Sequence, residues 1–294
     1  MPSYPRPKKV LAIQFKQIGD SVLVVPSLRA IRQQWPECEL HVIVFDNIAE
    51  ILRPIPWVNH VWGISKSKSP CSIFRTFRML FKLRSMKFCR SVDFGANDRG
   101  AWFGFFIHAK LRLGAKKKKE KGAFHISNYG YNQTIVQKYD DYYQASVLAS
   151  VLRMWGILPS ELNLELHVGN ESPKAANLDL PREFICLHLT TARNVKNWPV
   201  SKWSHLHDLL CERKIPVVVS AGSSREERQI AKSFSDASPN AMILPAFDTI
   251  HAFLHFIQYC RLLVCGDSAP AHIAAALHVS TLTLFGPTDH VLWK

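Results

Sequence analysis

Residues that could do chemistry gather in four short segments of the chain. They are Gly19-Asp20 and residues 190–199, 221–228 and 266–277. Each follows a run of β-forming residues and precedes a helical pattern. In open parallel sheets, ligands bind at the loops that leave the carboxyl ends of the strands. We therefore expect the binding site of this protein to be built from these four loops.

Asp20 stands at the start of a helical pattern, next to a glycine that permits a tight turn and close approach of the backbone to a ligand. Its carboxylate could cap the helix, which stabilises by about 1 kcal/mol. It could also act as a general base that takes a proton from an attacking hydroxyl. Position alone favours the cap.

Residues 190–199 combine threonine hydroxyls with Arg193 and Lys196 just before a helical segment. Hydrogen-bond donors and positive charge suit a diphosphate. An ordinary polar loop with solvated charges is the alternative.

Residues 221–228 place Glu226 and Glu227 in a first helical turn, where the helix dipole favours acids in any case. The alternative is that one of them binds the hydroxyl pair of a ribose.

The fourth segment begins at Gly266 and continues into an alanine-rich helix. Asp267 and Ser268 are suitable helix caps, and the backbone amides behind them could bind a phosphate. His272 is either a core histidine or part of that site.

Other catalytic patterns are missing or incomplete. His251 and His255 have i, i+4 spacing, but the sequence pattern supplies no accompanying Glu or third ligand, so we expect no metal there. The chain has no G-x-S-x-G, G-x-x-x-x-G-K-[ST] or G-x-G-x-x-G sequence, which disfavours serine hydrolases, P-loop enzymes and dinucleotide-binding proteins.

The elements that position these loops alternate between strand and helix in both halves of the chain. Strands are expected at residues 10–15, 39–45, 91–94 and 109–113, and then at 184–189, 216–220, 262–265 and 280–285. A polar segment with two prolines, residues 167–182, is the expected linker. The predicted fold class is therefore α/β, with two parallel domains, residues 1–168 and 169–294, facing each other across a cleft.

Residues 73–90 form a helical pattern rich in phenylalanine and basic residues. We expect a helix whose apolar arc covers the sheet; a helix lying on a membrane surface is the alternative. Lys116 to Lys121 is expected to be a surface loop.

Positive charge is concentrated in the first half. Residues 1–168 contain 25 Lys and Arg against 12 Asp and Glu, whereas residues 169–294 contain 12 against 11. This favours an acidic partner or an anionic membrane surface for the first domain. Nucleic acid is disfavoured, because no stacking platform of aromatic residues accompanies the lysine run.

The seven cysteines include no C-x-x-C pair and are read as reduced core residues. The apolar run at residues 10–15 is too short for a secretory signal. Both observations point to the cytoplasm.

Five motifs in this order resemble glycosyltransferase family 9, the lipopolysaccharide heptosyltransferases. They are residues 18–29 (IGDSVLVVPSLR), 196–199 (KNWP), 222–228, 266–277 (GDSAPAHIAAAL) and 284–289 (LFGPTD). The resemblance implies a GT-B fold of two Rossmann-like domains and an inverting transfer of heptose from an ADP-sugar to the lipopolysaccharide inner core. We expect a monomer at the cytoplasmic face of the inner membrane. The charge difference between the halves, together with the position of the donor motifs, predicts an anionic sugar-lipid acceptor in the first domain and the nucleotide sugar in the second.

The resemblance also assigns roles to residues. Asp20, beside Gly19, matches the catalytic base, and Lys196 matches the lysine that neutralises the leaving diphosphate. Thr191 lies in the same loop, and Glu227 matches the ribose position. The phosphate-side motif is matched by Asp267, Ser268, Ala269 and His272. No metal or other cofactor is expected, because Lys196 and a helix N-terminus can carry the charge of the leaving group.

Three departures from the family pattern stand out. The sequence stops at Lys294, soon after the GPTD motif, where the family normally continues with helices that return to the first domain; a short form or a truncation is expected, with an effect on interdomain closure. Ala269 occupies a position where the family usually has glycine, so we expect a modest shift in donor affinity. The 189–192 segment reads Leu-Thr-Thr-Ala in place of a glycine-containing version. The alternatives to a heptosyltransferase are a related transferase with another nucleotide sugar and surface glycan, and an inactive basic binding protein.

Overall fold

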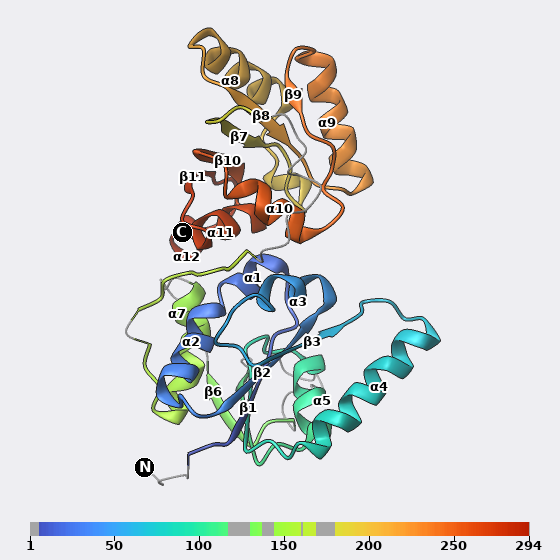
Figure 1. The fold of residues 1–294 in the computed structure, drawn as a ribbon, viewed down its shortest axis with the longest axis vertical. Helices are drawn as coiled ribbons and strands as arrows, with labels where there is room; N and C mark the ends of the chain where they lie inside the picture. Colours follow the sequence, from blue (N-terminus) through green and yellow to red (C-terminus); the bar gives the residue numbers. More distant parts are fainter. Residues whose placement is uncertain (1–5, 117–129, 137–143, 160, 169–179, 294) are drawn as a thin grey trace. The chain divides into compact units, whose positions relative to one another are not determined.

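The chain folds into two compact units, Met1–Asn163 and Leu164–Lys294. A computed structural model describes residues 6–116, 130–136, 144–159, 161–168 and 180–293. Figure 1 draws the first unit in blue to green and the second in yellow to red. Most of the expected linker, residues 169–179, lies outside the described residues, as do residues 117–121 of the expected lysine-rich loop.

The N-terminal unit is built on a six-stranded parallel sheet with strand order β3-β2-β1-β4-β5-β6. Its strands are β1 (Lys9–Ile13), β2 (Glu39–Phe45), β3 (His60–Ile64), β4 (Arg90–Asp93), β5 (Leu111–Lys116) and β6 (Gln133–Val136). The central strand β1 is buried from Val10 onward, and β2 is buried from Leu40 onward. Continuous apolar runs of this kind are typical of parallel strands covered on both faces.

Six helices and a 3₁₀ turn are described in this unit. They are α1 (Ile18–Val22), α2 (Val25–Gln34), α3 (Asp46–Leu52), α4 (Pro70–Ser85), α5 (Asp98–Ile107), α7 (Gln144–Ser150) and the 3₁₀ turn Val151–Trp155. Helix α3 packs against β2 and β3, α5 packs against β4 and β5, and α2 lies beside α7.

Helix α4 does not cover the sheet in the way the sequence predicted. It packs mainly on α5, at the periphery of the unit (Figure 1). Its buried residues are Leu80 and Leu83, and Phe88, just beyond the helix, is also buried, whereas Phe74, Phe77 and Phe81 are exposed. The prediction of a core-facing arc is therefore wrong for the phenylalanines of the helix itself. The sheet beneath is already covered by α5, so only a narrow stripe of α4 is needed for packing.

The C-terminal unit has a five-stranded parallel sheet with strand order β11-β10-β7-β8-β9. Its strands are β7 (Ile185–His188), β8 (Val217–Ser220), β9 (Met242–Ile243), β10 (Leu262–Gly266) and β11 (Ser280–Leu284). Its helices are α8 (Val200–Glu212), α9 (Arg225–Ala237), α10 (Ile250–Ile257), α11 (Ala269–Ala276) and α12 (His290–Trp293), and a 3₁₀ turn spans Asn194–Lys196. Trp203 of α8 is 1% exposed in the core beside Leu187, Val219 and Phe234.

The eight predicted strands are all present, and both sheets are parallel as predicted. The sequence reading missed β3, β6 and β9. Strand β3 contains Gly63, β6 has only four residues and β9 has two, so none presents a long apolar run. All three lie toward a sheet edge, where less burial is required.

The cysteines only partly follow the expectation of core positions. Cys38, Cys186, Cys260 and Cys265 are buried thiols, but Cys71 and Cys211 are exposed. The two exposed cysteines lie on the outer faces of α4 and α8. Among the described residues, no helix combines the length and apolar character needed to cross a bilayer.

Candidate functional site

The donor-side residues of the sequence prediction follow three neighbouring strands. Thr191 and Lys196 come after β7, Glu227 follows β8, and Asp267 follows β10. Since β7 pairs with both β8 and β10, these loops leave the same edge of the C-terminal sheet side by side. Parallel strands thus bring together residues that are far apart in the sequence.

Lys196 and Asp267 form an ion pair at this edge. The Lys196 Nζ lies 2.6 Å from Oδ2 of Asp267 and 3.3 Å from the carbonyl oxygen of the same residue. The two side chains are 18% and 5% exposed. An ammonium group has three N–H donors. Within the described residues, both recorded acceptors of Lys196 belong to Asp267, which leaves a third donor for an incoming anion.

His272 completes a charged cluster with this pair. It lies in the first turns of α11 and is buried. Burial lowers the pKa of His272; the negative charge of Asp267 opposes this shift, and the positive charge of Lys196 adds to it. The imidazole is therefore neutral near pH 7. Lys196, Asp267 and His272 are called the donor cluster below.

The N-terminus of α11 is not capped as the sequence predicted. Ser268 occupies the N-cap position but makes no side-chain cap, since its Oγ donates to the carbonyl oxygen of Gly266 at 3.2 Å. Asp267 is paired with Lys196 and is not the cap either. Pro270 has no N–H, and the amide of Ala271 donates to the carbonyl oxygen of Ser268 at 3.1 Å. Among the described residues, the amide of the half-buried Ala269 thus has no acceptor. An anion could take that place.

Thr191 shapes the loop that carries Lys196. Its Oγ1 donates to the carbonyl oxygen of Arg193 at 2.8 Å, and its amide donates to Oδ1 of Asn197 at 2.7 Å. A Cβ added to Gly266 would lie 2.7 Å from Cγ2 of Thr191. The loop after β7 and the end of β10 can approach this closely because residue 266 is glycine.

Glu227 is held in a capping box at the start of α9. Its Oε2 accepts from the amide of Ser224 at 3.0 Å, and its own amide donates to Oγ of Ser224 at 3.2 Å. Its Oε1 accepts, at 3.3 Å, from the hydroxyl of Thr190, the residue before Thr191. The local role of this first-turn acid is confirmed. Binding of a ribose by Glu227 stays a prediction.

Asp20 lies in the N-terminal unit, inside α1. The N-cap of that helix is Gln17, so Asp20 is its third residue and the cap interpretation is wrong. Gly19 is buried within the helix and does not form the predicted turn before it. The helix begins at Ile18, three residues earlier than the sequence indicated, and residues 18–22 form a short helix that is separate from α2, which starts at Val25.

The environment of Asp20 suits a proton acceptor. Burial raises the pKa of Asp20, while the charge of Lys16 and the backbone amides of Gln17 and Asp20 oppose that shift. The backbone carbonyl of Asp20 accepts from Nε2 of Gln14 at 3.2 Å, which ties α1 to the end of β1. A carboxylate with a raised pKa is a stronger base than one in water.

A basic pocket that the sequence reading missed opens at the same end of the N-terminal sheet. It has a volume of about 420 Å³ and is lined by Phe15, Lys16, Gln17, Phe45, Lys66 and Arg99. Lys66 Nζ lies 4.7 Å and the Arg99 guanidinium 5.3 Å from the centre of the Phe45 ring. The three cations come from separate segments, the loops after β1 and β3 and the first turn of α5, so only the fold shows that they share one pocket.

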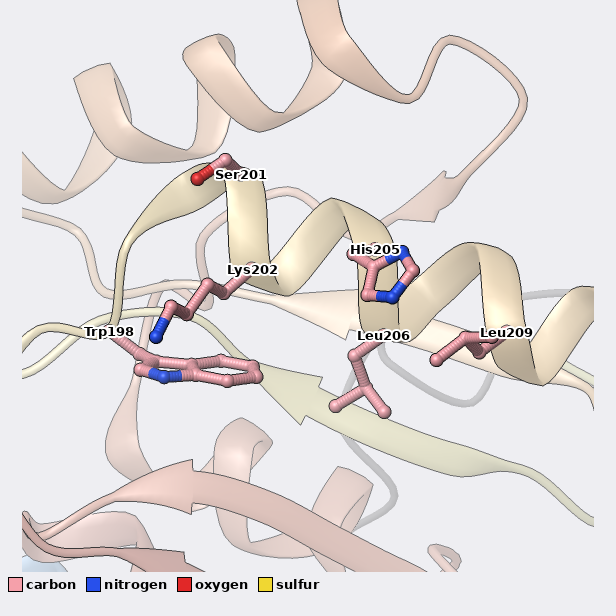
Figure 2. A pocket seen from close by; sticks show the side chains of 6 residues that line it. All are labelled: Trp198, Ser201, Lys202, His205, Leu206 and Leu209. Carbon is pink, nitrogen blue, oxygen red and sulfur yellow. The ribbon is translucent and has the colours of Figure 1, made fainter.

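A second pocket, of about 310 Å³, lies along the outer side of α8 (Figure 2). Its lining consists of Trp198, Ser201, Lys202, His205, Leu206 and Leu209. None of these residues belongs to the donor cluster. The lining is largely apolar, and we assign this pocket no part in donor binding.

Two groups of histidines have spacings that could suit a metal ion. The rings of His251 and His255 are 4.7 Å apart on α10, but within the described residues no third ligand joins them. Glu39, His41 and His60 do gather within 4.8 Å. There, the indole N–H of Trp62 donates to Nδ1 of His41 at 3.2 Å, which leaves the proton of a neutral ring on Nε2, toward Glu39. A metal would need that nitrogen unprotonated, so this group is a hydrogen-bonded cluster as it stands.

Comparison with known proteins agrees with this arrangement. The profile of glycosyltransferase family 9 (heptosyltransferase) matches residues 77–294. The chain therefore belongs to this family and is a glycosyltransferase. A curated relative, lipopolysaccharide heptosyltransferase 3 of Escherichia coli, is 24% identical over 94% of this chain and 83% of its own length. Lipopolysaccharide heptosyltransferase 1 of Pseudomonas aeruginosa is 24% identical over 96% of this chain and 79% of its own length.

Solved structures share the fold. A family 9 glycosyl transferase from Veillonella parvula superposes with a TM-score of 0.84 at 15% identity, over 97% of this chain and 83% of that one. The E. coli heptosyltransferase WaaC with ADP superposes with a TM-score of 0.78 at 18% identity, over 97% of this chain and 89% of that chain. With the two parallel sheets, these similarities establish the predicted GT-B fold of two Rossmann-like domains.

Proposed function

We propose that this protein transfers a heptose from ADP-heptose to the inner core of lipopolysaccharide, with inversion at the sugar carbon. The observation that carries the proposal is the donor cluster, in which a lysine with a remaining N–H lies beside an uncapped helix N-terminus. Membership in the family supports a sugar nucleotide as substrate. Relatives named lipopolysaccharide heptosyltransferases, and a neighbour solved with ADP-2-deoxy-2-fluoro heptose, support the identity of the donor.

The diphosphate would bind between Lys196 and the start of α11. The third N–H of Lys196 and the amide of Ala269 are suitable donors for phosphate oxygens, and His272 lies beside the Lys196–Asp267 pair. Ala269 brings a methyl group to this position, which we expect to alter affinity only modestly. Glu227 would accept from the ribose hydroxyls through lone pairs that its capping bonds leave open.

The reaction is a single displacement. An acceptor hydroxyl oxygen attacks the anomeric carbon and forms the new C–O bond, and the bond from that carbon to the β-phosphate oxygen breaks. Asp20 takes the hydroxyl proton, and ADP leaves with the electron pair. Lys196 and the amide of Ala269 at the N-terminus of α11 stabilise the charge that develops on the leaving group. Attack from the face opposite the leaving group inverts the carbon, and these groups provide the charge stabilisation without a metal.

The acceptor would be an anionic sugar-lipid bound by the basic pocket of the N-terminal unit. Lys16, Lys66 and Arg99 supply three cations there, and Lys16 also influences Asp20. A pocket of this charge suits phosphate or carboxylate groups on the acceptor. We expect the protein to work as a monomer at the cytoplasmic surface of the inner membrane.

Binding and transfer assays test the proposal. ADP should raise the melting temperature of the protein more than UDP or GDP at equal concentration, because bound ligand stabilises the folded state. Incubation with ADP-heptose and heptose-free lipopolysaccharide core should yield ADP and a core one heptose heavier by mass spectrometry. Stabilisation by UDP alone, or transfer from a UDP-sugar only, would show that the donor is a UDP-sugar and not ADP-heptose.

A further inference from the structure

Helix α4 displays a stripe of exposed aromatic side chains. Phe74 is 69% exposed, Phe81 is 61% exposed and Phe77 is 42% exposed. At 100° per residue these three fall on one face, and the buried Leu80 and Leu83 lie on the side turned toward α5. A folded protein rarely leaves several large apolar side chains together in water without a use for them.

The stripe continues onto α5. The rings of Phe77 and Trp102 are 6.4 Å apart, and those of Phe81 and Phe106 are 5.4 Å apart. Phe105, also on α5, is 54% exposed. Figure 1 shows the two helices side by side at the periphery of the N-terminal unit. The stripe therefore belongs to a two-helix surface, called the α4–α5 surface below.

The charge around the stripe is entirely positive over a long stretch of chain. Residues 65–92 contain eight Lys and Arg and no Asp or Glu. The exposed members are Lys66, Lys68, Arg75, Arg78, Lys82, Arg84 and Lys87. On the helix, Arg75, Arg78 and Lys82 border the stripe on one side and Arg84 on the other. Aromatic side chains flanked by cations are typical of helices that lie in a lipid interface.

We propose that the α4–α5 surface docks this protein on a membrane of anionic lipids. The aromatic rings enter the boundary between head groups and acyl chains, and the flanking cations contact the lipid phosphates. Each Lys or Arg near an anionic surface strengthens binding on the order of fivefold. This inference deepens the proposed function, because it assigns a residue-level surface to the approach of a lipid-borne acceptor.

Charge decides between this partner and a second copy of the chain. Two such surfaces facing each other would bring together the eight cations of residues 65–92 on each copy, against one acid in the first turn of α5, Asp98. A flat anionic lipid layer complements both the charge and the row of rings. Nucleic acid is anionic like the lipid surface, but it offers no apolar layer for the exposed phenylalanines. Binding to nucleic acid is therefore one of the outcomes that the test distinguishes.

Vesicle co-sedimentation tests the proposal with the full chain. The wild-type protein should bind vesicles of phosphatidylglycerol and phosphatidylethanolamine, should release them as salt increases and should bind pure phosphatidylcholine weakly. Phe74→Ser with Phe81→Ser, and separately Arg78→Glu with Lys82→Glu, should each lower vesicle affinity at least tenfold. Leu158→Ser, at a side chain 70% exposed outside α4 and α5, and Lys232→Glu on α9 serve as controls. Unchanged affinity in both double variants overturns the proposal, as does binding to duplex DNA without binding to vesicles.

A label on a native cysteine provides a second readout. Cys71 is exposed on α4 and Cys211 is exposed on α8. A polarity-sensitive fluorophore on Cys71, in a Cys211→Ser background, should shift to shorter wavelength when anionic vesicles are added. The same fluorophore on Cys211, in a Cys71→Ser background, should not. A shift at Cys211 alone would move the contact to α8 and overturn the proposal. Stabilisation by ADP, measured on the same samples, reports separately on the donor site.

Discussion

The carboxyl ends of the two sheets carry positive charge in different ways. At the C-terminal sheet, Lys196 is held by a buried carboxylate 2.6 Å away. At the N-terminal sheet, Lys16, Lys66 and Arg99 line an open pocket whose lining contains no acid. A cation fixed by a partner is preorganised for one small anion. Several cations on separate segments of the chain suit a larger ligand with dispersed negative charge. The difference fits a diphosphate on one side and a charged sugar-lipid on the other.

The largest effect that would test this comparison is expected at Asp20. Asp20→Asn should lower the rate of transfer about 10²- to 10⁴-fold, because it removes the proton acceptor. ADP affinity should stay unchanged, since the donor cluster lies in the other unit. Steady-state kinetics together with calorimetric titration of ADP measure both quantities. A variant with nearly normal turnover would reduce Asp20 to a structural residue of α1.

The raised pKa of Asp20 adds a pH signature. The base must be ionised to act, so the acidic limb of the rate profile should lie above the range of an ordinary aspartate. Because its pKa is raised, Asp20 binds a proton more tightly in the folded state than in the unfolded state. Its contribution to the free energy of unfolding is therefore lost as pH rises through the folded pKa. Asp20→Asn should therefore be at least as stable as the wild type at pH 7. Asp46→Asn, an acid in the first turn of α3, is the matched control.

Lys196→Ala should weaken ADP binding about 10- to 100-fold, the loss expected for one charge-assisted hydrogen bond. It should also lower the free energy of unfolding, by up to about 3 kcal/mol, because Asp267 remains buried without its partner. Titration calorimetry and denaturant unfolding measure the two effects. Lys202→Ala, on the outer side of α8, should change neither. Unchanged ADP affinity in Lys196→Ala would contradict the idea of a preorganised cation.

Gly266→Ala tests the close approach that positions Lys196. The added methyl would meet Cγ2 of Thr191 at 2.7 Å, so the loop after β7 must shift. We expect a loss of about 1–3 kcal/mol in stability and a weaker affinity for ADP. Adding Thr191→Ser removes that methyl group but keeps the hydroxyl bonded to Arg193, and it should restore most of both losses. Failure of this rescue would show that the contact does not set the loop.

The donor side could be predicted from the sequence in some detail because its residues lie in contiguous motifs. Lys196, Asp267 and His272 were each expected at the carboxyl end of a strand, and the structure brings them together. What the motifs did not show was the ion pair, which depends on two loops 71 residues apart. Ser268 and Asp267 look like caps in sequence, yet both side chains are engaged elsewhere.

The N-terminal unit was harder to predict because its function-bearing residues are dispersed. Lys16, Lys66 and Arg99 carry no local signal, and only strand order brings them to one pocket. Periodicity identified α4 as amphipathic but could not decide which face would be buried. That choice depends on α5, which covers the sheet and leaves the phenylalanines of α4 outside.

The smallest effect concerns Glu227, where capping and binding can be separated. Ser224→Ala removes the hydroxyl half of the capping box and should cost about 1 kcal/mol of stability with little change in ADP affinity. Glu227→Ala should cost a similar amount of stability but also weaken ADP binding about fivefold, because the carboxylate that would meet the ribose is lost. Glu227→Gln retains the capping pattern and should fall between the two in ADP affinity. Equal ADP affinity for Ser224→Ala and Glu227→Ala would confine Glu227 to the helix terminus and leave nucleoside recognition to other residues of this edge.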